Sequence, residues 1–357
     1  MSLYVADLHA LRTQKIISSK FNLELNEPYT WFDYFIDEAV ANNHKYILYH
    51  DEQEREISRM DSYDDYWEVF NDKLQKHDIK FIMAFSGYPK NPEYKFQEKY
   101  SNITIYNTPL YFLNFLYYLD VDIIKKLSYE IKNIRNRNNF KKLFINLNFK
   151  NHDFRCELMD FLCKNDLLKY GVYSWLKEGG NEDVYSFKYF DNEYRELGYK
   201  PRTMGRDYYW IDLLYENPLI NLITESDDSK IGISEKTCKS ILIGQPFIVY
   251  SAKGFHYALK EFGFELYDEI FDYSFDLYEN RTDRIKAICD NLNKLKDKNL
   301  NEIYDLISYK LEKNKNIAID IIENKKFIDQ DYLKLMMNNK DKFENKISTF
   351  NFFNLDK

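Results

Sequence analysis

Short apolar strands alternate with amphipathic helices in this chain, and this alternation limits the fold more than any other feature of the sequence. In the first third, a helix at 30–42 precedes the strand KYILYH (45–50), and a helix at 63–75 precedes the strand KFIMAF (80–85). A further strand is expected at 103–106. Strands that are joined through helices of this length pair in parallel. The pattern therefore predicts an α/β fold built on a parallel sheet.

The same alternation begins again in the middle of the chain. The expected elements there are strand KLFINLN (142–148), helix 153–164, strand LINLIT (219–224), helix 235–243 and strand PFIVY (246–250). From residue 281 onward the chain is charged and helical. A length of 357 residues favours two domains. We expect two Rossmann-like domains, at 1–140 and 141–325, followed by a helical tail at 326–357.

Composition narrows the class of protein. The net charge of -8 does not favour a protein held mainly on nucleic-acid phosphates, although residues 125–150 carry eight Lys or Arg and one acid. The four cysteines lack CxxC spacing, which favours reduced thiols over a zinc site or disulfides. The N-terminus has no signal-peptide pattern, and no apolar run is long enough to span a membrane. We expect a cytoplasmic protein without a membrane span.

Two turns carry the residues from which chemistry can be inferred, because ligands of parallel sheets bind where strands end and helices begin. The first turn runs from Asn148 to Arg155 and also holds Lys150 and His152. Its polar and basic side chains surround a helix start, which favours an anion. The alternative interpretation is a solvated basic turn.

The second turn lies between strand 219–224 and helix 235–243. Ser234 is the expected N-cap, and Lys236 and Lys239 share one helix face near the amino end. Glu235 suits the helix dipole, or alternatively accepts hydrogen bonds from a ribose diol. Neither GxGxxG nor GxxxxGK[ST] occurs, which weakens the case for NAD binding or a P-loop.

The segment ISEKTCKSILIGQPFIVYSAKGFHYALKEFGFELYDEIFD (233–272) resembles the donor-binding signature of fucosyltransferase-like GT-B glycosyltransferases. It is closest to a phage and bacterial branch with the pattern SEKT-x-K-P-I, a PF-[IV]-[IV] strand and a GF-x-[TL]-[FY] stretch. LINLITES (219–226) and KLFINLNFKNHDFRCELMDFL (142–162) are similar to that branch too. The resemblance covers roughly the C-terminal half. It departs from the pattern at Phe149, Lys150 and His152, which stand where Arg is common, and at Ser240, which replaces the usual Pro.

The resemblance implies a nucleotide-sugar transferase with two Rossmann-like domains facing a central cleft. In such enzymes the Glu at the position of Glu235 contacts the donor ribose, Lys236 faces the diphosphate, and Glu225 lines the same pocket. Asn148 and Arg155 match the opening loop. The expected donor-binding residues are Asn148, Lys150, His152, Arg155, Glu225, Ser234, Glu235, Lys236 and Lys239.

The chemistry of the transfer suggests the remaining roles. Lysine and arginine side chains at helix starts can stabilise a departing diphosphate without a metal or other cofactor. Asp227-Asp228 and Asp64-Asp65 are interpreted as loop and helix-surface charges, so no metal ligand is assigned. An inverting reaction needs a base for the acceptor hydroxyl, and Asp51 and Glu52, which follow strand 45–50, are the candidates, with a solvated acidic turn as the alternative.

We therefore expect a metal-independent glycosyltransferase whose partners are a nucleoside-diphosphate sugar and a hydroxyl acceptor such as a glycan. One alternative is a phage-type enzyme that glycosylates a hydroxymethylated DNA base, which makes nucleic acid a possible acceptor. The other is a non-catalytic GT-B binding protein. The sequence leaves open the sugar, the nucleotide base, the acceptor, the stereochemical outcome and the oligomeric state.

Overall fold

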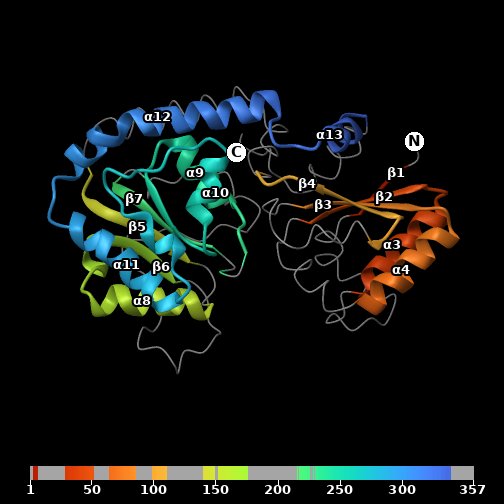
Figure 1. Ribbon diagram of the computed structural model, residues 1–357, viewed down its shortest axis with the longest axis horizontal. Helices are drawn as coiled ribbons and strands as arrows, with labels where there is room; N and C mark the ends of the chain where they lie inside the picture. Colours follow the sequence, from red (N-terminus) through yellow and green to blue (C-terminus); the bar gives the residue numbers. More distant parts are fainter. Residues whose placement is uncertain are drawn as a thin grey trace, which may run out of the picture. The chain divides into compact units, whose positions relative to one another are not determined.

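A computed structural model (Figure 1) describes residues 3–6, 29–51, 64–85, 99–110, 140–148, 152–175, 215, 217–225, 228 and 230–338. The chain divides into two compact units. Unit 1 comprises Met1–Tyr111 and Phe327–Lys357, and unit 2 comprises Phe112–Lys326. In the described part of each unit the strands form one parallel sheet, so the expected mixed α/β architecture with parallel sheets is confirmed.

Unit 1 contains sheet A, in the strand order β1-β2-β3-β4. Its strands are β1 (Leu3–Ala6), β2 (Tyr46–Asp51), β3 (Lys80–Phe85) and β4 (Ile103–Asn107). Helix α3 (Tyr29–Ala41) precedes β2, and helix α4 (Asp64–Lys76) connects β2 to β3. Each neighbouring pair is parallel. The order follows the sequence because each crossover places the next strand beside the last one.

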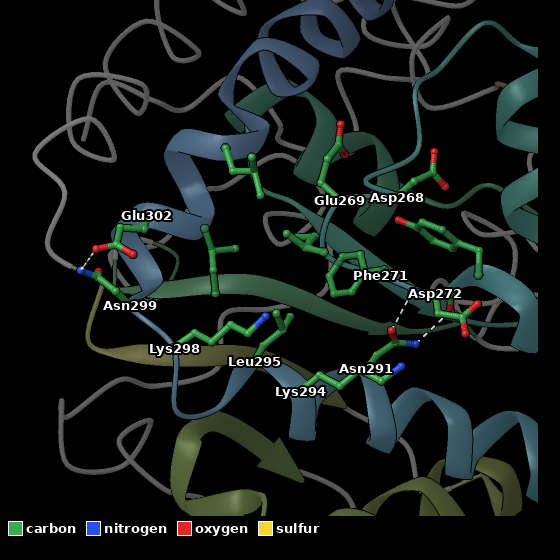
Figure 2. A pocket seen from close by; sticks show the side chains of 14 residues that line it. Asp268, Glu269, Phe271, Asp272, Asn291, Lys294, Leu295, Lys298, Asn299 and Glu302 are labelled. Carbon is green, nitrogen blue, oxygen red and sulfur yellow. Dashed lines mark hydrogen bonds between the residues drawn. The ribbon is translucent and has the colours of Figure 1, made fainter.

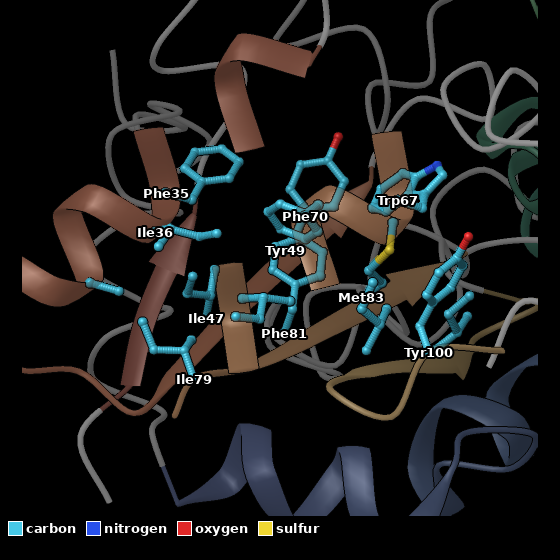
Figure 3. Close-up of a cluster of buried hydrophobic side chains, with 14 residues drawn as sticks. Phe35, Ile36, Ile47, Tyr49, Trp67, Phe70, Ile79, Phe81, Met83 and Tyr100 are labelled. Carbon is cyan, nitrogen blue, oxygen red and sulfur yellow. The ribbon is translucent and has the colours of Figure 1, made fainter. Parts of the chain in front are cut away.

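Aromatic side chains fill the core between sheet A and these two helices (Figure 3). The ring of Phe81 packs edge-on against Phe70, with 5.1 Å between centroids, and stacks with Tyr49 at 6.1 Å. The opposite face of the sheet presents Leu48 and Ile82, which pack against side chains of helix α13 (Gln330–Met337). Both faces of the central strands are thus covered, which explains their unbroken apolar sequence.

Unit 2 contains sheet B, in the strand order β6-β5-β7-β8, with each neighbouring pair parallel. Its strands are β5 (Lys142–Asn148), β6 (Gly171–Trp175), β7 (Pro218–Thr224) and β8 (Phe247–Tyr250). Its helices are α8 (Asp153–Lys164), α9 (Glu235–Ile243), α10 (Phe255–Glu261), α11 (Arg281–Leu295) and α12 (Leu300–Asn324), with short 3-10 turns η4 (Leu168–Tyr170) and η6 (Tyr273–Leu277). Helices α8 and α11 lie along one face of the sheet, and α9 and α12 lie along the other (Figure 1).

Local sequence signals determine where helix α9 begins and ends. The hydroxyl of Ser234 accepts a hydrogen bond from the backbone N–H of Lys236 at 3.3 Å, so it is the N-cap of α9. Gly244 ends the same helix in the left-handed region, at φ 65°. Strand β6 was not expected from the sequence. It begins at Gly171, where an added Cβ would lie 2.4 Å from the ring of Phe144, so the glycine lets β6 pair closely with β5.

Candidate functional site at the carboxyl edge of sheet B

The strand order of sheet B places a switch point between β5 and β7. From β5 the chain first adds β6 on one side, and it later adds β7 and β8 on the other. In open parallel sheets the crevice beyond the carboxyl ends of two such strands is where ligands bind. Strand β5 ends at Asn148 and β7 at Thr224, so the two turns that the sequence singled out begin at this switch point.

A chain of buried polar side chains leads to this edge through the interior of the sheet. The Asn146 amide donates to the carbonyl oxygen of Leu222 at 2.6 Å, and Asn148 Nδ2 donates to Asn146 Oδ1 at 2.6 Å. The Thr224 hydroxyl donates to Asn148 Oδ1. These bonds fix the orientation of Asn148, a residue that the sequence analysis predicted for the donor site. Sequence reasoning missed Asn146, although it is a second polar residue on the same face of an apolar strand.

Arg155 joins the two turns. It lies in the first turn of α8 and is only 5% exposed. Its Nε and Nη2 donate to the carbonyl oxygen of Glu225 at 3.1 and 2.8 Å, and Nη2 also approaches the carbonyl oxygen of Thr224 at 3.3 Å. The guanidinium thus joins the start of α8 to the backbone at the end of β7 and the start of the second turn.

The Glu225 carboxylate is buried at 2% exposure and is surrounded by donors from the start of α9. The Ser234 hydroxyl donates to Oε1 at 2.7 Å, the Thr237 hydroxyl lies 3.5 Å from Oε1, and Lys236 Nζ lies 3.5 Å from Oε2. A buried carboxylate needs such partners because its charge is costly outside water. Glu225 therefore holds the start of α9 in place.

Lys236 brings a positive charge to the amino end of α9. Its ammonium lies 3.3 Å from Glu235 Oε1 as well as 3.5 Å from Glu225 Oε2, and its side chain is 31% exposed. Because the Lys236 side chain is partly exposed, its ammonium can also donate hydrogen bonds to a ligand at the amino end of α9. The Glu235 carboxylate beside it can accept hydrogen bonds from hydroxyl groups.

The other predicted residues lie elsewhere in unit 2, in unit 1, or outside the described residues. The His152 ring stacks on Phe154 with 5.8 Å between centroids, and Lys239 Nζ lies 5.6 Å from the ring centroid of Tyr215. Lys150 and Glu52 fall outside the described residues. Asp51 is the last residue of β2 in unit 1, at the carboxyl edge of sheet A, where its backbone is paired with Phe85.

The described residues also bear on metal binding and on membrane insertion. Within them no three His, Cys, Asp or Glu side chains gather in the way a metal site requires. None of the helices in the same part of the chain is both long and apolar enough to cross a bilayer.

A groove of about 800 Å³ lies elsewhere in unit 2 (Figure 2). It is lined by the last turns of α11, the first turns of α12 and the loop 268–273, and it shares no residue with the predicted site. Asn291 in its wall exchanges two hydrogen bonds with the backbone of Asp272, at 2.7 and 2.9 Å. The first turn of α11 contacts Ser251 at the carboxyl edge, so the groove lies roughly 15 Å further along this helix.

Comparisons with known proteins do not assign the chain to a family. No family model matches the chain, and no curated protein matches it. Among solved structures, a glycosyltransferase from Rickettsia africae is similar over 89% of this chain and 87% of its own, at 9% identity and a TM-score of 0.33. A likeness this loose says nothing about activity, and the parallel α/β fold of this chain rests on its own strand pairing.

Proposed function

We propose that the chain is a glycosyltransferase that moves a sugar from a nucleoside-diphosphate sugar to a hydroxyl acceptor, such as a glycan, without a divalent metal. The observation that carries the proposal is the partly exposed ammonium of Lys236, held by Glu225 and Glu235 at a helix start beside the switch point of sheet B. A diphosphate leaving group gains negative charge as the glycosidic bond breaks, and a fixed cation at a helix amino end stabilises that charge.

The geometry favours two kinds of role within the donor site. Lys236 contacts the diphosphate and Glu235 accepts hydrogen bonds from the ribose, with Lys150, His152 and Lys239 as further donor-side residues. Arg155, Glu225, Ser234 and Asn148 act as positioning residues, since each makes a hydrogen bond to another part of sheet B or of the two turns. This division follows from the observed hydrogen bonds, which hold Arg155, Glu225 and Ser234 against other parts of the protein.

The catalytic base belongs to the same proposal. An inverting transfer requires a group that removes the proton of the acceptor hydroxyl, and we assign this role to Asp51 or Glu52. Asp51 ends a parallel strand at the carboxyl edge of sheet A, which is the edge where ligands of such sheets bind.

The test is a titration of the full chain with UDP, GDP and their sugars, by calorimetry in the presence of EDTA. We expect Lys236→Ala to weaken binding of the preferred nucleoside diphosphate by roughly tenfold to a hundredfold, because a charge-assisted hydrogen bond is worth about 1.5–3 kcal/mol. The side chain is partly exposed, so the variant should remain folded.

The matched control is Lys286→Ala, which removes the same charge from an exposed ion pair with Asp283 on α11. It should bind nucleotides like the original chain. Equal affinities of the two variants would contradict the proposed site, and failure of all nucleoside diphosphates to bind in EDTA would contradict the metal-free donor complex.

A further inference from the structure

Polar side chains also gather at the start of α11, one strand away from the proposed donor site. Tyr250 and Ser251 come at the carboxyl end of β8, and Tyr250 is in register with Thr224 of β7. Arg281 and Arg284 lie in the first turn of α11. Asp228 reaches them from the loop between β7 and α9. None of these five residues is among those assigned to the proposed donor site.

Three hydrogen-bond donors in this cluster are buried without a partner among the described residues. They are the hydroxyls of Tyr250 and Ser251 and the Nε group of Arg284, and each residue is more than nine-tenths buried. The Arg284 guanidinium lies 5.6 Å from the ring centroid of Tyr250, and its Nη1 donates to the carbonyl oxygen of Ser251 at 2.5 Å. Buried polar groups are normally paired, so three unpaired donors in one place need an explanation.

The Tyr250 hydroxyl faces the charges of the same cluster. Burial raises its pKa well above the usual value, the charge of Asp228 raises it further, and the guanidinium groups of Arg284 and Arg281 lower it. The phenol therefore keeps its proton at neutral pH and acts as a donor. Glu157 on α8 adds a weaker negative charge, and its carboxylate accepts a hydrogen bond from the Thr282 hydroxyl at 2.7 Å.

One carboxylate already lies against these donors. Asp228 Oδ2 is 2.8 Å from Arg281 Nε and 4.0 Å from Arg284 Nη2, and the Asp228 side chain is 14% exposed. A carboxylate and a phosphate present similar oxygen atoms to a guanidinium. Asp228 comes from a loop, which makes it easier to displace than a side chain of a strand or helix.

We propose that Arg281, Arg284, Tyr250 and Ser251 form a binding site for an oxyanion, a phosphate or carboxylate group of a ligand, whose place Asp228 holds in the free protein. Two guanidinium groups and two hydroxyls can all donate hydrogen bonds to such a group, and the amino end of the 15-residue helix α11 adds a favourable dipole. The site is separate from Lys236 and does not depend on the donor chemistry proposed for it.

The test is a calorimetric titration of the full chain with inorganic phosphate, with Asp228→Asn as the central variant. Removing the internal competitor should tighten phosphate binding roughly fivefold or more, because a larger fraction of the protein is then ready to bind. Asp283→Asn is the matched control, since it makes the same change of charge in an exposed pair with Lys286 on the same helix. It should alter the affinity much less.

Arg281→Gln should change phosphate binding in the opposite direction to Asp228→Asn. Arg281 is 43% exposed, so the variant should fold, and it should weaken phosphate binding roughly fivefold or more. Repeating the titrations with Lys236→Ala present separates this site from the proposed donor site. Equal effects of Asp228→Asn and Asp283→Asn, weaker binding by Asp228→Asn, or unchanged binding by Arg281→Gln would each overturn the proposal.

Discussion

Sheet A and sheet B share a four-stranded parallel design but differ in what their central strands bury. In the described part of unit 1, strands β2 and β3 bury apolar side chains such as Ile47, Phe81 and Met83. Strands β5 and β7 of unit 2 bury polar side chains among apolar ones, namely Asn146, Asn148, Asn221 and Thr224. A four-stranded parallel sheet therefore carries an apolar core in one unit and a bonded polar network in the other.

The polar network of sheet B continues beyond the strands. Asn221 donates to the Ser240 hydroxyl at 2.8 Å, and that hydroxyl donates to the carbonyl oxygen of Lys236 at 3.0 Å, which joins β7 to α9. Buried polar groups contribute little net stability when they are paired and are costly when they are not. Such a network is thus better suited to fixing the positions of side chains than to increasing stability, and here it surrounds the proposed donor site.

The largest expected effect lies in the apolar unit. Phe81→Ala should lower the free energy of unfolding of unit 1 by about 3–5 kcal/mol, because Phe81 is fully buried against Phe70 and Tyr49. Hydrogen exchange measured by mass spectrometry reports the two units separately. We expect faster exchange in β3 and little change in β7. An equal loss of protection in both sheets would show that the two units unfold together. It would then contradict the expected difference in stability between sheet A and sheet B.

Arg155→Ala should have the next largest effect. It leaves the carbonyl oxygen of Glu225 without its guanidinium donors, and we expect unit 2 to lose about 2–3 kcal/mol. Arg155→Lys keeps the charge but not the planar fork of the guanidinium. Its loss of stability should therefore be smaller than that of Arg155→Ala. Urea unfolding followed by exchange in β7 measures the loss. Unchanged stability together with weaker nucleotide binding would make Arg155 a ligand-contacting residue instead.

Ser234→Ala should produce the smallest loss, about 1 kcal/mol, because it removes the N-cap of α9. It also removes the hydrogen bond of 2.7 Å to the buried Glu225 carboxylate, so nucleotide affinity should fall although Ser234 need not touch the ligand. Ser234→Thr keeps the hydroxyl and should restore both properties. Failure of the threonine variant to restore affinity would separate the cap from the proposed donor site.

Much of the fold could be predicted from local patterns. Strand β5 and helices α8 and α9 begin and end where the sequence placed them, since caps and apolar periodicity are set by neighbouring residues. Strands β1 and β6 and helix α10, of four, five and seven residues, were not predicted, whereas the equally short strand β8 was. The contacts of Arg155 with Glu225 join residues 70 positions apart, and no local pattern contains that information.

The sequence by itself determined that this chain is an α/β protein with parallel sheets, because the lengths of its apolar runs and helices leave few other ways to bury them. It also singled out two turns whose side chains are candidates for anion binding. Only the tertiary structure decided that β5 lies beside β7, that Arg155 bonds to the backbone of the second turn, and that Asp228 meets Arg281. The physical reason is that strand order and side-chain pairing depend on packing between distant segments, whereas helix and strand formation depends mainly on neighbours in the chain.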